Sequence, residues 1–308
     1  MKVEASAPIR ICDLGGWTDT WFAESGVVLN IAVTPRIRVT ATLGRGAPTQ
    51  DRLIDAAIAR WCPALPVSVL VESPVPPGSS TGTSASLCVA LAGALRTLAG
   101  NPPSKEEAAQ EAWSLEYEDL RRQSGVQDQF AAAFGGISLL AVDAFPAAKR
   151  QPVHEPEGLE DALSLVYLGQ PHDSSDVHLN VIRRLEAGGD RAVLDALRGY
   201  ATEGYRCLES NDLPGFAAAM VGNTEAQRLL DPAMIGVEAQ AVIDLAKRTG
   251  AQGWKVNGAG GAGGSVTALH LDPSRREAFR AEVLRRPPWR LIPVQIDHQG
   301  LVVLKFDS

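Results

Sequence analysis

Residues 67–99 constrain the fold more than any other stretch of this chain. A strand-like run at 67–72 ends among three prolines, and a loop of Gly, Ser and Thr follows at 78–83. The next segment, 84–99, has no proline and is rich in Ala and Leu, which predicts a buried helix ending before Gly100. The N-terminus of such a helix favours an anion, because its first N–H groups are free and the macrodipole is positive there. The pattern therefore predicts a phosphate-binding loop, with a plain helix-capping loop as the alternative.

The charge balance limits how a phosphate can be bound and which partners fit. The 308 residues carry 29 Lys+Arg against 36 Asp+Glu, a net charge of -7, and none of the six lysines follows a glycine. The Gly-Lys step of a P-loop is therefore absent. The acidic balance argues against a nucleic acid or a membrane surface as partner, because both usually require a basic patch.

Cysteine use and hydropathy favour a reduced intracellular compartment. The four cysteines, Cys12, Cys62, Cys88 and Cys207, are scattered without a C-x-x-C pair or a metal-ligand spacing, so we expect buried thiols. The N-terminus has no apolar leader, and the longest uncharged apolar stretch, 85–95, is too short to span a bilayer. We expect a cytoplasmic protein.

The remaining pattern predicts an α+β chain. Helices are expected at 105–122, capped by Ser104, at 126–134 and at 273–285, and three or four more lie between Ser174 and Thr249. Strands are expected at 27–33, 36–42, 67–72, 137–142, 163–168, 252–256, 265–271, 291–296 and 301–306. We predict two lobes, 1–165 and 166–308.

A second glycine-rich segment lies at 255–264. Gly258, Gly260 and Gly263 satisfy G-x-G-x-x-G, but residues 265–271 are strand-like, so the helix that a dinucleotide fingerprint requires is missing. A tight turn or bulge explains two glycines. Five glycines in seven residues indicate that the backbone approaches another group closely.

Several charged residues stand near turns, and each alone has an ordinary explanation. Asp128 begins a short helix after Ser124-Gly125, where the helix dipole favours a carboxylate. Glu116 on the preceding helix is typical of a solvated surface. Arg10 and Asp19 flank the Gly15-Gly16 turn, and each would pass for a surface charge.

Taken together, three segments resemble the motifs of the GHMP family of small-molecule kinases, the superfamily of galactokinase, homoserine kinase and mevalonate kinase. Residues 7–20 resemble its N-terminal substrate motif, 77–85 its Gly/Ser phosphate loop, and 255–264 its C-terminal glycine motif. The resemblance covers essentially the full length. It implies a two-lobed α+β fold, with an N-terminal lobe like ribosomal protein S5 domain 2 and a ferredoxin-like C-terminal lobe.

Within the family, the chain is most similar to sugar kinases of the L-fucokinase-like and heptose 7-phosphate kinase-like groups, which phosphorylate the anomeric hydroxyl. This rests on Gly-Gly-Trp-Thr-Asp-Thr at 15–20 and on residues 125–136. Galactokinase has Glu-His where this chain has Gly16-Trp17, which disfavours galactose. In the phosphate loop, Ser80 replaces a usual Gly and Thr81 a usual Leu.

The resemblance implies a role for each matching residue. Asp128 would orient the acceptor hydroxyl, and Arg10 would hold Asp128 ionised and stabilise the transferring phosphoryl group. Magnesium would be held by Ser84 and Glu116. ATP would be bound by Pro77, Gly78, Ser79, Ser80, Thr81, Gly82, Thr83, Ser84 and Ala85. The substrate would be bound by Gly16, Trp17, Thr18, Asp19, His172, Gly258, Gly260 and Gly261.

The expected function is transfer of the ATP γ-phosphoryl group, with Mg²⁺, to O1 of a free hexose or 6-deoxyhexose such as L-fucose. One alternative is a kinase converting heptose 7-phosphate to the 1,7-bisphosphate. It needs a second basic pocket, for which arginine pairs such as Arg121-Arg122 are candidates, although each more simply forms a solvated helix face. The other alternative is a non-catalytic sugar sensor. A monomer or a homodimer is expected.

Overall fold

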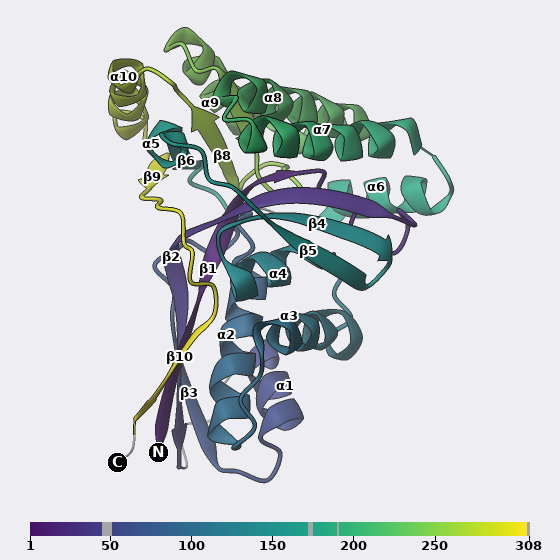
Figure 1. Cartoon of the computed structure of the whole chain (residues 1–308), viewed down its shortest axis with the longest axis vertical. Coiled ribbons are helices and arrows are strands. Elements are labelled where there is room, and N and C mark those ends of the chain that lie inside the picture. Colours follow the sequence, from purple (N-terminus) through teal and green to yellow (C-terminus); the bar gives the residue numbers. More distant parts are fainter. Residues whose placement is uncertain (45–50, 172–174, 190, 307–308) are drawn as a thin grey trace.

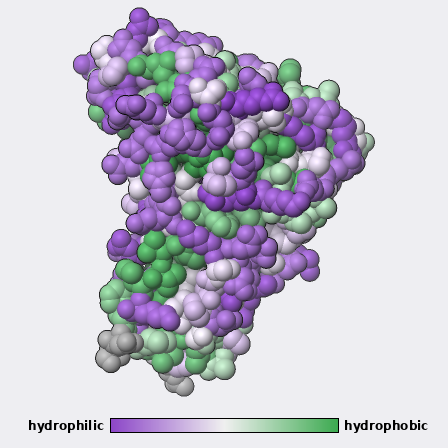
Figure 2. All heavy atoms as spheres, viewed as in Figure 1, coloured by the Kyte–Doolittle hydropathy of each residue, from purple (hydrophilic) through white to green (hydrophobic). Residues whose placement is uncertain are grey.

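The computed structural model describes residues 1–44, 51–171, 175–189 and 191–306. Two antiparallel sheets and the helices packed against them form an elongated molecule (Figure 1). The prediction of a two-lobed α+β fold is confirmed. Figure 2 shows hydrophilic side chains over most of one face, with hydrophobic ones in patches. Among the described helices, none is long and apolar enough to cross a membrane.

The first sheet has the strand order β10-β1-β2-β4-β5, and β3 pairs with the C-terminal part of β2, residues 38–43. The strands span Lys2–Leu14 (β1), Gly26–Leu43 (β2), Val67–Glu72 (β3), Ile137–Ala144 (β4), Ala147–Val153 (β5) and Val302–Phe306 (β10). The two strands predicted at 27–33 and 36–42 form the single strand β2. Pro35 does not end it because the β1–β2 register shifts between Pro8 and Ile9, where the ladder already lacks regular pairs.

Helices α1 (Arg52–Trp61), α2 (Thr83–Leu98), α3 (Lys105–Ser114) and α4 (Gln127–Phe134) pack with β1 and β2 around one apolar core. The buried helix predicted at 84–99 is α2, and its interior residue Gly93 lies against Leu301, where a Cβ would come within 2.8 Å of a leucine methyl. Ser104 caps α3 in a capping box with Glu107. The helix predicted to reach residue 122 changes at 115 to a π-helical turn, η1 (Leu115–Asp119), which contains the buried Glu116.

The second sheet has the order β7-β8-β6-β9. Its strands are Gly253–Val256 (β7), Ser265–Leu269 (β8), Leu163–Tyr167 (β6) and Arg290–Ile292 (β9), and it packs on α9 (Val237–Arg248) and α10 (Pro273–Leu284). Helices α7 (Arg191–Glu209) and α8 (Leu213–Leu230) connect the sheets, since α7 contacts β2 and α8 contacts β7. The remaining elements are α5 (Leu159–Ala162), α6 (Ser175–Glu186) and η2 (Pro232–Met234).

The predicted boundary between residues 165 and 166 falls inside β6, the first strand of the second sheet. The last strand, β10, returns to the first sheet and pairs with β1 (Figure 1). The division into 1–165 and 166–308 therefore stays a prediction. It follows the order of the chain and does not coincide with the membership of the two sheets. The sequence pattern did not predict β1, β5 or α1, and the strand expected at 291–296 is the shorter β9.

Candidate active site

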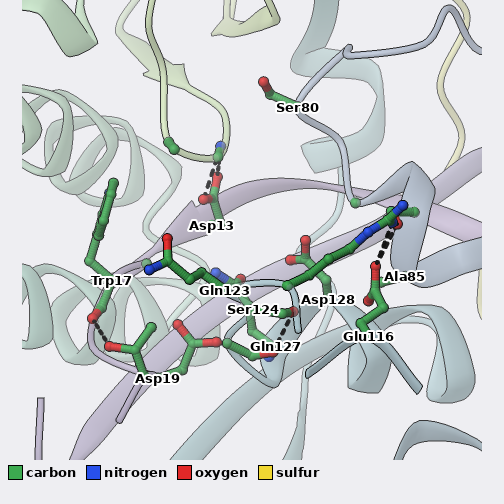
Figure 3. A pocket seen from close by; sticks show the side chains of 18 of the residues that line it. Asp13, Trp17, Asp19, Ser80, Ala85, Glu116, Gln123, Ser124, Gln127 and Asp128 are labelled. Atoms are coloured by element: carbon green, nitrogen blue, oxygen red, sulfur yellow. Dashed lines mark hydrogen bonds and ion pairs between the residues drawn. The ribbon is translucent and has the colours of Figure 1, made fainter. Parts of the chain in front are cut away.

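A pocket of about 690 Å³ opens where the two sheets meet. The turn after β1, the phosphate loop, the start of α4, the Gly258 turn and α6 all contribute to its wall. Figure 3 shows lining side chains from the turn after β1, the phosphate loop and the start of α4 around one space. The volume lies within the range of small-molecule sites.

The centre of the pocket is an ion pair between Arg10 on β1 and Asp128 in the first turn of α4. Arg10 Nε lies 2.8 Å from Asp128 Oδ1, and Nη2 lies 3.2 Å from Oδ2, which is a bidentate contact. Burial alone would lower the pKa of Arg10. The carboxylates of Asp128 and Asp13 outweigh this effect, so the pKa of Arg10 lies above its ordinary value. Arg10 Nη1 also donates to the Ser80 carbonyl at 2.6 Å, so this cation joins the carboxylate to the phosphate loop.

The phosphate loop leads into α2 without a side-chain cap. Gly82, with φ of 70°, is the N-cap residue, so the N–H groups of the first turn receive no cap acceptor. Six predicted loop residues line the pocket: Gly78, Ser80, Gly82, Thr83, Ser84 and Ala85. Three others do not: Pro77, Ser79 and Thr81. The buried hydroxyls of Ser79 and Thr81 contact each other at 2.7 Å, so these side chains face inward.

The predicted metal ligands, Ser84 and Glu116, lie side by side, and the Ser84 hydroxyl donates to Glu116 Oε1. Burial raises the pKa of Glu116, whose other oxygen accepts from Gln129 Nε2 at 2.8 Å. A hydroxyl and a carboxylate beside a phosphate loop fit Mg²⁺, which takes few protein oxygens and completes its shell with phosphates and water. Across the described ranges, three or more His, Cys, Asp or Glu residues never cluster as metal ligands.

The turn after β1 brings Gly16, Trp17 and Asp19 to the pocket, whereas Thr18 is folded into the turn and donates to Gly15 O. Asp19 Oδ2 accepts from the N–H groups of Val126 and Gln127, each at 2.9 Å, and thereby caps α4 from a distant segment. Burial and the nearby Asp128 raise the pKa of Asp19 to about 6, although the backbone hydrogen bonds oppose this.

The C-terminal glycine segment contributes Gly258 to the pocket. Gly260 and Gly261 instead pack on η2, where the Gly261 N–H donates to Met234 O at 2.8 Å. The predicted substrate residue His172 lies outside the described residues. The structure thus brings the predicted catalytic and metal residues together with part of the predicted substrate set.

Sequence reasoning missed several residues at this site. Asp13 lines the pocket, as do the aromatic residues Trp21 and Phe22. Arg122, which the sequence analysis named only as part of a candidate pair for a second phosphate, lines it as well. Lys255 was counted in the glycine segment without a role, yet it is fully buried in the short strand β7. A lysine within a short apolar strand is a usable signal, because a buried charge requires a partner.

Comparisons with known proteins agree with this geometry. The family model described as "GHMP kinases N terminal domain" matches residues 52–136. A mevalonate kinase from Methanothermobacter thermautotrophicus is 26% identical over 293 residues, which is 87% of this chain and 90% of that protein.

Two relatives are named as sugar kinases. A D-glycero-alpha-D-manno-heptose 7-phosphate kinase from Campylobacter jejuni is 27% identical over 69% of this chain and 63% of its own length. An L-fucokinase/L-fucose-1-P guanylyltransferase from Bacteroides fragilis is 26% identical over 96% of this chain, which spans 38% of that protein.

Among solved structures, a D-glycero-D-manno-heptose 1-phosphate kinase from Bacteroides thetaiotaomicron has a TM-score of 0.77 at 20% identity. The alignment covers 99% of this chain and 100% of that one, so the whole fold is shared. These findings confirm the resemblance stated from the three motifs.

Proposed function

We propose that this chain, a member of the GHMP kinase family, transfers the γ-phosphoryl group of ATP to a sugar hydroxyl. The acceptor we favour is O1 of a free hexose or 6-deoxyhexose such as L-fucose. The observation that carries the proposal is the Arg10–Asp128 pair, since its cation also contacts the phosphate loop at Ser80 O, 2.6 Å away. Acceptor and phosphate chemistry therefore share one side chain.

The geometry suits phosphoryl transfer by positioning and charge. Asp128 is directed into the pocket, where it would accept a hydrogen bond from the attacking hydroxyl and orient it (Figure 3). Because Arg10 holds Asp128 by two hydrogen bonds, the carboxylate is fixed in place to orient the hydroxyl. The N-terminus of α2 would receive the ATP phosphates. Ser84 and Glu116 would hold Mg²⁺, which neutralises phosphate charge when bound.

The other end of the pocket suits a polyol with an apolar face. Trp17, Trp21 and Phe22 provide aromatic surface against which a sugar ring or methyl group can pack. Gln127 lines the same space, and its buried Oε1 has no hydrogen-bond partner among the residues that the structure describes. A buried acceptor without a partner costs free energy, so a hydroxyl donor from the substrate would satisfy it.

The cations of the pocket favour an unphosphorylated acceptor. Among the described lining residues, Arg10 and Arg122 are the basic ones. Arg10 is paired with Asp128, and Arg122 Nη1 lies 3.0 Å from the Ser84 hydroxyl, beside the phosphate loop. The described aromatic end therefore offers no cation for a second phosphate. The heptose 7-phosphate alternative rests on the resemblance of residues 15–20 and 125–136 and on the name of a relative.

A coupled assay decides between these acceptors. Purified protein with ATP and Mg²⁺ is mixed with a panel of free hexoses, 6-deoxyhexoses and heptose 7-phosphate, and ADP release is measured. ³¹P NMR of the product identifies the phosphorylated oxygen. We expect ADP release with a free sugar. Release only with heptose 7-phosphate would establish the alternative, and none with any acceptor would support the sensor.

The variant Asp128→Asn tests the role of the central carboxylate. It should lower turnover by about 1,000-fold, because hydroxyl orientation and proton acceptance are typically worth two to four orders of magnitude. Its affinity for MgATP, measured by calorimetry, should stay near that of the unmodified protein. Retained turnover would remove Asp128 from the mechanism.

A further inference from the structure

A cluster of buried polar side chains lies directly behind the pocket wall. Lys255 on β7 is fully buried, and its Nζ lies 3.3 Å from Asp13 Oδ1 at the end of β1. The same Nζ donates to Gln227 Oε1 on α8 at 3.0 Å. A buried ammonium group is costly unless it is paired and hydrogen-bonded, so Lys255 requires both partners. The three side chains form one unit that we call the lysine clamp.

The lysine clamp holds both backbone polar groups of Gly258. The Gly258 N–H lies 3.1 and 3.0 Å from the two carboxylate oxygens of Asp13. The Gly258 carbonyl accepts from Gln227 Nε2 at 2.8 Å. Figure 3 shows the contact of Asp13 with this turn at the edge of the pocket. Lys255 therefore orients the two side chains that fix a residue of the pocket wall.

Gly258 in turn lies against the phosphate loop and the reacting centre. A Cβ at this position would come 3.1 Å from Ser80 O, 3.2 Å from Ser80 Cβ and 3.5 Å from Arg10 Nη2. Ser80 O is also the acceptor of Arg10 Nη1. A shift of Gly258 would consequently be transmitted to the phosphate loop and to Arg10.

The lysine clamp also balances charge beside Arg10. Asp13 Oδ1 lies 3.8 Å from Arg10 Nη1, so an uncompensated Asp13 would compete with Asp128 and a phosphoryl group for the same guanidinium. Burial alone would raise the pKa of Asp13, but Lys255, Arg10 and the Gly258 N–H hold it below its ordinary value. Lys255 is the second cation beside Asp13 and compensates its charge, so Arg10 stays available to Asp128 and to a phosphoryl group.

We propose that Lys255, Asp13 and Gln227 are positioning residues of this enzyme, which fix Gly258 against the phosphate loop and neutralise the charge behind Arg10. Lys255 and Gln227 do not line the pocket, so they act through Gly258 and Asp13. The predicted effect on turnover rests on the proposed kinase function. The predicted effect on Gly258 does not.

Hydrogen exchange of the nucleotide-free protein tests the clamp without any substrate. In Lys255→Met, the Gly258 amide should lose protection by about tenfold or more, because its acceptor is no longer held in place. Amides in the centre of α2 should exchange as before. Lys247→Met is the matched control. Lys247 is on α9, lies over the ring of Trp254 and does not line the pocket. Unchanged protection at Gly258 in folded Lys255→Met would overturn the proposal.

Charge rescue separates positioning from stability. Lys255→Met leaves an unpaired carboxylate beside Arg10, so MgATP affinity should fall about tenfold, and more than MgADP affinity, because the γ-phosphate adds charge there. Adding Asp13→Asn removes that charge and keeps an oxygen for the Gly258 N–H. The double variant should recover MgATP affinity to within about threefold of the unmodified protein, as expected if charge drives the loss.

Turnover gives the last readout. We expect kcat of Lys255→Met to fall about 100-fold, the loss expected when catalytic groups are misplaced by about 1 Å, with partial recovery in the double variant. If Lys255→Met does not fold, the uncharged change Gln227→Met, which frees only the Gly258 carbonyl, replaces it. If the double variant loses as much kcat and MgATP affinity as the two single changes together, without rescue, the role of Lys255 is purely structural and the proposal is wrong. Failure of the unmodified protein to turn over any acceptor would count against the proposed function, while exchange at Gly258 still tests the clamp.

Discussion

The two glycine-rich loops at the pocket have similar compositions but need their glycines for different reasons. In the phosphate loop, Gly78 and Gly82 take φ values of 67° and 70°, and Gly82 begins α2 without adding a side chain. In the C-terminal segment, a Cβ on Gly260 would lie 2.1 Å from Met234 O, and one on Gly263 would lie 2.4 Å from Gln170 O. Gly258 and Gly260 of the second loop also take positive φ values, 62° and 69°, so both loops rely on a backbone conformation that favours glycine. They differ because the first loop uses this conformation to expose N–H groups, whereas the second loop also needs the small size of glycine to pack.

The two loops also differ in how much of each one lines the pocket. The phosphate loop presents several consecutive residues to the pocket, whereas the C-terminal segment presents Gly258 and Ala259 and buries its other glycines. Ser265, after the second loop, donates to Ser79 O in the first at 2.6 Å, so the loops are also joined directly. Changes in the first loop should therefore alter activity, and changes in the second should alter stability.

Of the two loops, the first should show the larger effect on activity, through the change Gly82→Ala. An added Cβ would lie 3.3 Å from both Arg10 Cγ and Asp128 Cγ, at a φ that disfavours alanine. Displacement of this pair should lower kcat about 100-fold, with only about 1–2 kcal/mol lost from the free energy of unfolding. Steady-state kinetics and urea unfolding measure the two quantities. Near-normal kcat would contradict the role given to the loop.

The change Gly260→Ala should show the opposite balance. Its Cβ would collide with the Met234 carbonyl, which accepts from the Gly261 N–H. We expect a loss of about 3 kcal/mol or more in the free energy of unfolding, because the clash involves backbone that cannot move cheaply. The kcat per folded molecule should fall less than in Gly82→Ala. A larger kcat loss than in Gly82→Ala would break the distinction between the loops.

The turn after β1 sharpens the comparison, because it holds the pocket through a carboxylate whose effect depends on pH. Burial raises the pKa of Asp19 from 3.8 to about 6, so the folded state binds a proton that the unfolded state releases. The stability contributed by protonated Asp19 is fully present below pH 3.8 and is lost as pH rises through 6. The difference between the folded and unfolded pKa of Asp19 corresponds to roughly 3 kcal/mol in the free energy of unfolding.

Unfolding of the unmodified protein and of Asp19→Asn, compared at several pH values, measures this term. Relative to the variant, the unmodified protein should lose about 3 kcal/mol between pH 4 and pH 7. A difference that does not change with pH would show that Asp19 titrates normally.

The smallest effect is expected from Ser265→Ala at the junction of the loops. The change leaves the Ser79 carbonyl without this donor and removes one of the two acceptors of Asn257 Nδ2. It should cost about 1–2 kcal/mol in the free energy of unfolding, the usual penalty for a buried unsatisfied group. Ser210→Ala, an exposed hydroxyl at the end of α7, is the control.

Local pattern predicted the elements whose cause is local. The apolar segment 84–99 corresponds to α2, and Ser104 caps α3, because helix propensity and capping act within a few residues. Strand β1 was missed, since its mixed sequence becomes a strand only by pairing with β2 and β10. In the same way, Pro35 did not divide β2, because it lies in the irregular part of β2 where the register with β1 shifts and leaves it unpaired.

The sequence by itself determined the chemical groups at the centre, because the family resemblance names Arg10, Asp128, Ser84 and Glu116, and all four line one pocket. Only the tertiary structure decided how they are supported. Asp13 and Lys255 are 242 residues apart, and Asp19 caps a helix 107 residues away. Such contacts leave no periodic trace in the chain, because a buried charge or an uncapped helix requires a partner without specifying where in the sequence that partner lies.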